Sequence, residues 1–159
     1  MQQLQAQQFK KERVMPSISR YINVISRCGN MYRTERLKET DLGTAHHTYL
    51  FTICRNPGIS QDKLARMIYI NKSNVTRNLA VLEKNGYIER HPDPQDKRVM
   101  LVYPTQKAQD TLPRLREIMH DWNELVAADF TEEELDQLRS MLARIAERAT
   151  GYADDIEFD

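Results

Sequence analysis

The chain has 159 residues, of which 23 are Lys or Arg and 23 are Asp or Glu, so its formal net charge is zero. This length suits one compact domain with a sizeable core, and an aromatic content of 8% with a charged content of 29% excludes a disordered or fibrous protein. No apolar run approaches the roughly 20 residues that span a bilayer, no signal peptide is recognisable, and two cysteines cannot form a disulfide scaffold. We therefore expect a cytoplasmic protein without a membrane anchor.

Charge is distributed unevenly along the chain. Residues 1–54 carry a net charge of +4. Residues 63–107 contain nine Lys or Arg and four Asp or Glu, a net charge of +5, whereas residues 108–159 contain five Arg and fourteen acids, a net charge of −9. A basic centre beside an acidic end indicates an anion-binding region carried by a segment that need not touch the anion. Ordinary solvated helix faces are the alternative explanation of the same counts.

The first third of the sequence predicts an arm followed by two helices. Residues 1–16 are rich in glutamine and form the expected N-terminal arm. From Ser17, apolar residues recur every three or four positions, as on one face of a helix, and we assign residues 17–42 to a dimerisation helix. These apolar residues are Ile18, Ile22, Ile25, Gly29 and Tyr32. A second helix is expected over about residues 45–55.

Two helix N-caps lie close together in the centre of the chain. Ser60 precedes a short helix expected over residues 61–67, and Asn71 precedes a longer helix expected over residues 72–85. Gly86 then suits the position just beyond a helix end. Two capped helices separated by a tight turn are typical of a helix-turn-helix unit.

A β-hairpin is expected directly after these helices. Residues 87–91 and 99–103 are strand-like, and the loop between them, residues 92–98, is rich in Pro and Asp. Together with the capped helices, the hairpin predicts a winged helix-turn-helix lobe over residues 43–104. The expected fold class is therefore mainly α with a small β-hairpin wing, in which this lobe is joined to a helical dimerisation region.

Two amphipathic helices are expected over residues 105–159. Thr105 can cap the first, in which Pro113 either causes a bend or marks the start of the straight part. Thr131 begins a capping box for the last helix, which should end near Gly151. The two apolar stripes are Leu112, Leu115, Met119, Trp122 and Val126, and Leu135, Leu138, Leu142, Ile145 and Ala149. Because these stripes have heptad-like spacing and exceed the needs of one small core, we expect a partner chain.

The polar face of the helix over residues 72–85 carries residue types that read DNA. An α-helix fits the major groove, and the first residues of a recognition helix reach base edges. The candidates on this helix are Lys72, Ser73, Asn74, Thr76 and Arg77. Arg77 can donate two hydrogen bonds to guanine, and Asn74 can pair with adenine. Lys72, with Ser60 and Gln61 at the preceding helix start, suits phosphate contacts.

The hairpin loop contains a second group of DNA-binding candidates, Asp96, Lys97 and Arg98. If Asp96 accepts a hydrogen bond from the Arg98 guanidinium, it holds that group at the wing tip, where it can enter the minor groove. The alternative is an ordinary exposed ion pair, which contributes at most about 1 kcal/mol. The position of the loop beside the recognition helix favours the DNA-binding interpretation.

Four segments together resemble the MarR (multiple antibiotic resistance regulator) family of bacterial transcription factors. They are residues 59–65, 71–77, 82–88 and 90–98, and the resemblance extends over about residues 17–151. The segment 103–108 departs from the family pattern, in which Leu-Thr is followed by Gly two or three residues later. The resemblance implies a homodimer joined through its first and last helices, with one DNA-binding lobe per subunit. It also implies control by a small ligand, often an anionic aromatic compound, held between the lobe and the dimerisation helices.

We therefore expect a homodimeric, ligand-responsive transcriptional regulator, a repressor, that reads a pseudo-palindromic operator in double-stranded DNA. A two-fold dimer presents its recognition helices about 34 Å apart, one turn of DNA. The alternatives are a winged-helix protein-interaction module and a redox-sensing regulator based on Cys28. The sequence has no Gly-rich phosphate loop, HExxH motif or nucleophile elbow, so neither an enzyme nor a cofactor is expected.

The effector site has less distinct signals. Ligand pockets are mostly apolar with a few polar groups, and the candidates are Arg20, Tyr21, His47 and Trp122. Adjacent His46 and His47 point to different helix faces, unlike a chelating i, i+4 pair, so no metal site is expected. A reactive thiol needs a lowered pKa and partial exposure, and we expect Cys28 to be a small buried core residue instead.

Overall fold

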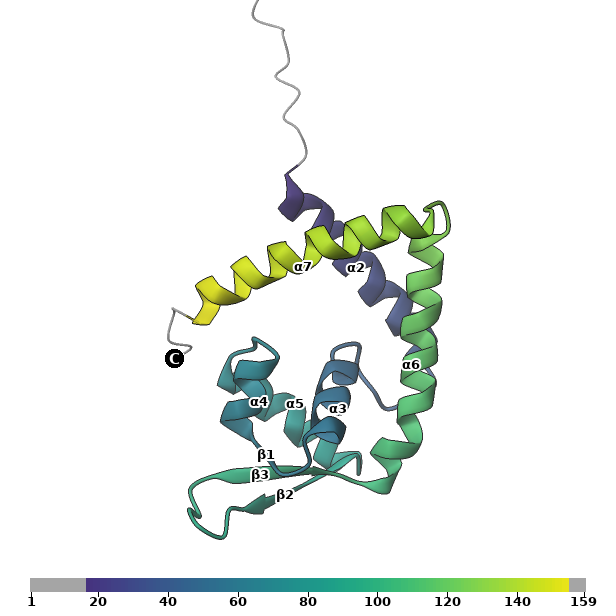
Figure 1. Ribbon diagram of the computed structural model, residues 1–159. Coiled ribbons are helices and arrows are strands. Elements are labelled where there is room, and N and C mark those ends of the chain that lie inside the picture. Colours follow the sequence, from purple (N-terminus) through teal and green to yellow (C-terminus); the bar gives the residue numbers. More distant parts are fainter. Residues whose placement is uncertain (1–16, 155–159) are drawn as a thin grey trace, which may run out of the picture.

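The computed structural model describes residues 17–154, so the arm expected over residues 1–16 lies outside the described part of the chain. The elements in chain order are α2 (Ile18–Leu37), α3 (His46–Arg55), β1 (Ile59–Ser60), α4 (Gln61–Met67), α5 (Lys72–Lys84), β2 (Ile88–Pro92), β3 (Met100–Pro104), α6 (Gln106–Ala127) and α7 (Glu132–Asp154). Elements α3 to β3 form a lobe, and the long helices α2, α6 and α7 flank it (Figure 1). The expected fold class, mainly α with a small β wing, is confirmed.

Side-chain caps fix where α2, α4, α5, α6 and α7 begin, whereas Ala45 before α3 makes no side-chain cap bond. Ser17, Ser60, Asn71 and Thr105 each accept a hydrogen bond from the backbone N–H three residues later, at distances between 2.8 and 3.4 Å. Thr131 forms the expected capping box, because its N–H donates to Glu134 Oε2 at 2.8 Å while the Glu134 N–H donates to Thr131 Oγ1 at 3.3 Å. These bonds satisfy backbone donors that the first turn of a helix leaves free.

The sheet has the strand order β1-β3-β2, and both pairs are antiparallel. Val102 of β3 pairs with Arg90 of β2 on one side and with Ile59 of β1 on the other. The two wing strands lie one residue further along the chain than expected. Strand β1 was not expected, because a two-residue strand is too short to show an alternating pattern. It ties the start of α4 to the wing.

A single apolar core holds the lobe together and extends onto α6. It contains residues from each element of the lobe and from the first half of α6. Strand β2 contributes only its first residue, Ile88. Its fully buried members are Tyr49, Leu50, Ile53, Leu64, Val75, Leu79, Leu82, Ile88, Val102, Leu115 and Ile118. Ile118 was not part of the predicted stripe of α6, whose members Met119 and Trp122 are only half-buried. Leu112 and Leu115 of the predicted stripe are buried, so the core-facing side of α6 departs from the predicted one only from Ile118 onward.

The flanking helices bury far less of their surface. Helix α2 buries Gly29 and Leu37, and α7 buries none of its residues. Helix α6 begins at Gln106, so Pro113 lies inside it, and α7 continues past the expected end at Gly151 to Asp154. From the end of α6, α7 passes over α2 and extends above the lobe (Figure 1). Within residues 17–154, no helix is both long and apolar enough to cross a membrane.

The turn between α4 and α5 contains a strained residue. Tyr69 has a φ of +53°, in the left-handed region. Its N–H donates to the Arg66 carbonyl at 3.2 Å, and the next N–H, of Ile70, donates to the Ala65 carbonyl at 3.1 Å. These two bonds end α4 in one tight turn. A residue with a Cβ atom adopts this conformation at a cost of about 1–2 kcal/mol, whereas glycine adopts it without strain.

We expect Tyr69→Gly to have a free energy of unfolding about 1 kcal/mol higher than that of Tyr69→Ala, because only glycine removes this strain. Tyr69 is 41% exposed, so both variants lose the packing of its buried part, and this loss cancels in the comparison. Urea unfolding at fixed protein concentration measures the change. The control, Ala80→Gly, lies at an exposed position inside α5 and should lower stability by about 1 kcal/mol. Unfolding of Tyr69→Gly at a lower urea concentration than Tyr69→Ala would contradict the strain argument.

Candidate functional site

The recognition helix α5 has two opposite faces. Val75, Leu79 and Leu82 are buried in the core of the lobe. This burial fixes the rotation of the helix and leaves the first-turn candidates at the surface. The exposed ones are Lys72, Ser73, Thr76 and Arg77. The predicted DNA-reading face therefore lies on the outside of the lobe, as the apolar spacing indicated.

The candidates on α5 differ in how free their side chains are. Asn74 is half-buried, and its side-chain oxygen accepts a hydrogen bond from Asn78 Nδ2 at 2.6 Å. Thr76 donates to the Lys72 carbonyl at 2.9 Å, and Lys72 Nζ lies 3.7 Å from Asp62 Oδ1. Asn74 is thus held within the lobe surface, whereas Arg77 projects from it.

Ser60 and Gln61 lie where β1 passes into α4. The Ser60 hydroxyl oxygen accepts the Lys63 N–H at 3.2 Å as the helix cap, which leaves its own O–H available as a donor. Gln61 is half-buried, and its Oε1 is buried without a hydrogen-bond partner in the described part of the chain. Lys63 is exposed one residue beyond Asp62. A hydroxyl, an amide and an ammonium group therefore lie together at this edge.

The wing loop is ordered by aspartate side chains that bind its own backbone. Asp96 Oδ1 accepts the Arg98 N–H at 3.0 Å, and Asp93 Oδ1 accepts the Gln95 N–H at 2.8 Å. The expected bond between Asp96 and the Arg98 guanidinium is therefore wrong. An Asp side chain reaches the N–H two residues later more readily, which is the geometry of an Asx turn. Lys97 and Arg98 are both exposed at the tip.

An ion pair connects the wing to the recognition helix. The Arg90 guanidinium of β2 binds Glu83 Oε2 of α5 through two nitrogens, with Nε at 3.0 Å. Hydrogen bonding from Arg90 lowers the pKa of the Glu83 carboxyl, so the pair stays charged. The sequence did not predict this pair, since its members belong to different elements separated by a turn. It holds the base of the wing against α5.

A second group of candidates lies between α2, α3 and α6. The ring of Trp122 on α6 packs 5.5 Å from that of Tyr32 on α2. Gly29 allows this approach, because a Cβ atom there would lie 3.3 Å from the indole ring and 3.2 Å from Arg33 Nη1. On α3, His47 Nδ1 lies 2.6 Å from the Thr44 carbonyl. Trp122 and His47, two of the predicted effector residues, therefore both lie near Arg33.

The cation at this junction is Arg33 and not the expected Arg20. Arg33 is half-buried, its Nη2 donates to Asn30 Oδ1 at 2.7 Å, and its Nε has no hydrogen-bond partner within the described residues. Burial lowers the pKa of the Arg33 guanidinium, and its charge contributes to the lowered pKa of His47, after burial. Arg20 and Tyr21 are exposed in the first turn of α2, and Arg20 lies about 20 Å from Arg33 along the helix axis. Arg33 lies four residues after Gly29 and therefore on the same face of α2, and this spacing is the signal by which the sequence could have identified it.

The cysteine and histidine expectations have mixed outcomes. Cys28 is exposed on α2, so its expected place in the core is wrong. Cys54 is half-buried, and burial raises the pKa of its thiol, which disfavours the reactive thiolate. His46 is buried and its Nδ1 accepts the Gly43 N–H at 2.9 Å, a bond separate from that of His47. Among residues 17–154, no three His, Cys, Asp or Glu side chains are grouped to hold a metal ion.

Two capped helices joined by a tight turn, with a β-hairpin wing bonded to the second helix, define a winged helix-turn-helix protein. The MarR family profile matches residues 40–99. The HTH-type transcriptional regulator YybA of Bacillus subtilis strain 168 is 34% identical over 131 residues, which cover 82% of this chain and 87% of YybA.

Solved structures agree with this match. A putative MarR family transcriptional regulator from Listeria monocytogenes, crystallised with 26mer DNA, is 31% identical and has a TM-score of 0.80, covering 87% of this chain and 93% of its own. A MarR protein from Peptoclostridium difficile DA00132 has a TM-score of 0.87 at 26% identity, covering 92% and 95% of the two chains. The chain belongs to the MarR family of transcriptional regulators.

Proposed function

We propose that the chain is a homodimeric, ligand-responsive repressor that binds a pseudo-palindromic operator in double-stranded DNA. The observation that carries this proposal is the exposed polar face of α5, beside a wing whose exposed tip holds Lys97 and Arg98. Because Glu83 and Arg90 fix the wing to α5, the two surfaces contact DNA as one unit. The Listeria relative crystallised with DNA supports this assignment.

Each candidate has a distinct role in the proposed complex. Arg77 reads a guanine in the major groove, because its guanidinium is exposed and can donate two parallel hydrogen bonds. Ser73 contacts the neighbouring base or phosphate, and Asn74 contributes through the conformation of this turn. Lys72, Thr76, Ser60 and Gln61 contact phosphates, and Arg98 enters the minor groove with Lys97 at the adjoining backbone.

A second copy of the chain is proposed to cover the exposed apolar surface of α2 and α7. On α2, Ile18, Tyr21, Ile22, Val24 and Ile25 are between 43% and 61% exposed. On α7, Leu138, Met141 and Leu142 are exposed, and no residue of this helix is buried. Exposed apolar side chains in this number are typical of an interaction site. A two-fold dimer through these helices places two copies of α5 in successive major grooves.

The effector is proposed to bind at the junction of α2, α3 and α6. Arg33 supplies a partly desolvated cation, and Tyr32 and Trp122 supply aromatic surface. A small aromatic carboxylate complements this combination, because its ring packs on the side chains and its charge pairs with the guanidinium. A ligand that prefers one separation of lobe and flanking helices shifts the population towards it and changes the fit to DNA.

For DNA binding, we expect Arg77→Ala to weaken binding to the selected sequence by about tenfold or more, in line with about 1–3 kcal/mol for a bidentate base contact. Arg98→Ala should also weaken binding. Fluorescence anisotropy measures both on a duplex selected from a random pool, at several salt concentrations, since counterion release makes affinity salt-dependent. Arg114→Ala, an exposed arginine of α6, is the control and should change nothing. Failure of the pool to enrich any motif would favour the protein-interaction module.

For the dimer, we expect Leu142→Glu to produce monomers, because it places a charge in the apolar surface of α7. Light scattering after size exclusion should give 18.7 kDa for the variant and twice that mass for the wild type. Ser140→Glu adds the same charge on the polar side of α7 and should leave the dimer intact. A wild type that is monomeric at micromolar concentration would rule out the proposed assembly.

For the effector, we expect millimolar 4-hydroxybenzoate to raise the melting temperature of the wild type and to release it from DNA. A ligand at 100 times its Kd stabilises the folded protein by about 2.7 kcal/mol, which a thermal-shift assay detects. Arg33→Met should abolish the shift, whereas Arg20→Met, the same change in the first turn of α2, should retain it. Loss of the shift in Arg20→Met alone would return the site to the originally predicted residue.

A further inference from the structure

We propose that Asp41, Asn85, Tyr87 and Lys107, here called the Asp41 cluster, position the recognition helix relative to α2 and α6. By doing so, the cluster sets the half-site spacing that the dimer accepts. This inference rests on the proposed function, since it concerns how two lobes fit one operator. The four residues come from the α2–α3 link, the end of α5, the entry to the wing and the first turn of α6.

The Asp41 carboxylate joins two distant elements. Its Oδ1 accepts a hydrogen bond from the Tyr87 hydroxyl at 2.6 Å, and its Oδ2 accepts from Lys107 Nζ at 2.9 Å. The bond from Tyr87 is the largest cause of the lowered pKa of Asp41, while burial and this carboxylate raise the pKa of Tyr87. The carboxylate therefore stays charged and the phenol stays a donor.

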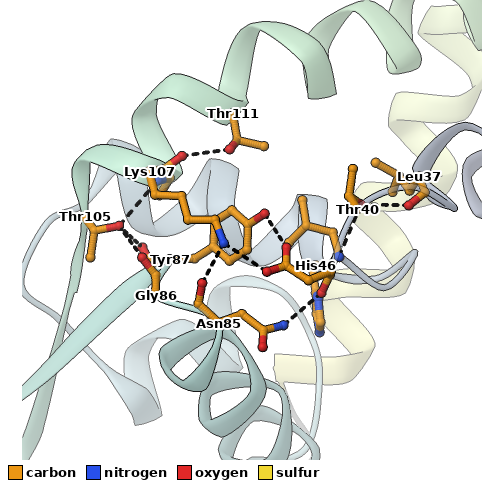
Figure 2. Close-up of polar contacts among 12 residues, drawn as sticks. Leu37, Thr40, His46, Asn85, Gly86, Tyr87, Thr105, Lys107 and Thr111 are labelled. Carbon is orange, nitrogen blue, oxygen red and sulfur yellow. Dashed lines mark hydrogen bonds and ion pairs between the residues drawn. The ribbon is translucent and has the colours of Figure 1, made fainter.

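The C-terminal end of α5 is held from two sides by the same cluster. Asn85, the C-cap residue of α5, donates from Nδ2 to the Asp41 carbonyl at 2.9 Å. Its own carbonyl accepts from Lys107 Nζ at 2.7 Å (Figure 2). A cation at a helix C-terminus interacts favourably with the free carbonyls there. The α2–α3 link and α6 are thus both bonded to the residue at which the recognition helix ends.

Contacts around the cluster extend this link to the wing. Lys107 Nζ lies 4.1 Å from the centre of the Tyr87 ring, and its side chain extends across that ring in Figure 2. The Thr105 hydroxyl, which caps α6, lies within hydrogen-bonding distance of the Gly86 carbonyl at 2.7 Å. Tyr87 itself is buried. Lys107 falls within the segment 103–108, where the sequence departs from the family pattern.

The dimensions of α5 explain why a restraint at its end matters for DNA. The helix has 13 residues and is therefore about 20 Å long. A tilt of about 10° at the held end moves the DNA-reading first turn by about 3.5 Å, close to the roughly 3.4 Å rise of one base pair. A small loss of restraint thus changes register by a whole base pair. The Asp41–Lys107 ion pair is partly exposed, and such pairs contribute little to folding stability. Its removal should therefore affect the position of α5 more than the stability of the fold.

The test compares DNA duplexes that carry the selected half-sites at the original spacing and at spacings changed by one and two base pairs. The wild type should lose at least tenfold in affinity when the spacing changes by one base pair. The spacing ratio is the affinity at the original spacing divided by the affinity at the changed spacing. In Lys107→Met and Asp41→Asn, this ratio should be at least threefold smaller than in the wild type. The salt dependence of binding should be unchanged, and thermal unfolding should be close to that of the wild type. Lys107→Arg, which keeps the charge, should restore the preference.

Two further variants keep the test decisive. Lys38→Met removes an exposed ion pair with Glu35 at the end of α2 and should leave spacing preference unchanged. Tyr87→Phe removes only a hydroxyl from the cluster, and it replaces Asp41→Asn in the spacing test if that variant fails to fold. An unchanged ratio in folded variants, or a wild type that accepts every spacing, overturns the role of the cluster alone. If no DNA motif is enriched by the wild type, the proposed function fails, and the role of the cluster fails with it.

Discussion

Burial of Val75, Leu79 and Leu82 against the core of the lobe is the constraint on which the rest of the structure depends. Three apolar side chains on one stripe leave α5 a single rotation, and every polar residue on the opposite side must then face solvent. The wing takes its position from the same helix, since Arg90 binds Glu83 on its surface. The arrangement of cations that we assign to DNA therefore follows from apolar packing on the side of the helix that DNA never meets.

Local signals in the sequence account for most of the fold, and for little of what connects its parts. The caps at Ser60, Asn71 and Thr105 were predictable because each acts within three residues of itself. The Asp41 cluster was not predictable, because its bonds join residues 22 to 66 positions apart in sequence. Arg36 and Asp121, which form an ion pair between α2 and α6, are 85 positions apart.

The errors at single residues have equally physical causes. A small residue on an apolar-patterned helix is not necessarily buried, and Cys28 lies on a surface of α2 that this chain leaves open. Asp96 was assigned to the Arg98 side chain, but the nearer backbone N–H takes that bond. Arg20, the predicted effector residue, lies one helix end away from Arg33, and where Trp122 of α6 packs along α2 depends on tertiary contacts that the sequence does not show. The exposure of the candidate DNA-reading residues on α5 depends only on helix phase and needed no such information.

The zero net charge of the chain conceals how its Lys and Arg side chains are used. Three basic residues of the segment 63–107, Lys72, Arg90 and Lys107, pair with acids within the fold. The pair of Arg90 with Glu83 joins the wing to α5, and we assign a positioning role to the pair of Lys107 with Asp41. The excess of cations in this segment is thus partly structural, and the number of phosphates the lobe can neutralise is smaller than the sequence count implies.

Helix α7 spans 23 residues and buries none of them within its own chain. In a protein, most of the stability of a helix comes from packing of its apolar face, and α7 receives little of it within one chain. In the proposed dimer, ordering of α7 and association of subunits are then one equilibrium, so stability rises with the concentration of the chain. In that case, a subunit at a concentration below the Kd of association presents an unpacked helix to proteases. The lifetime of the regulator would then depend on its abundance.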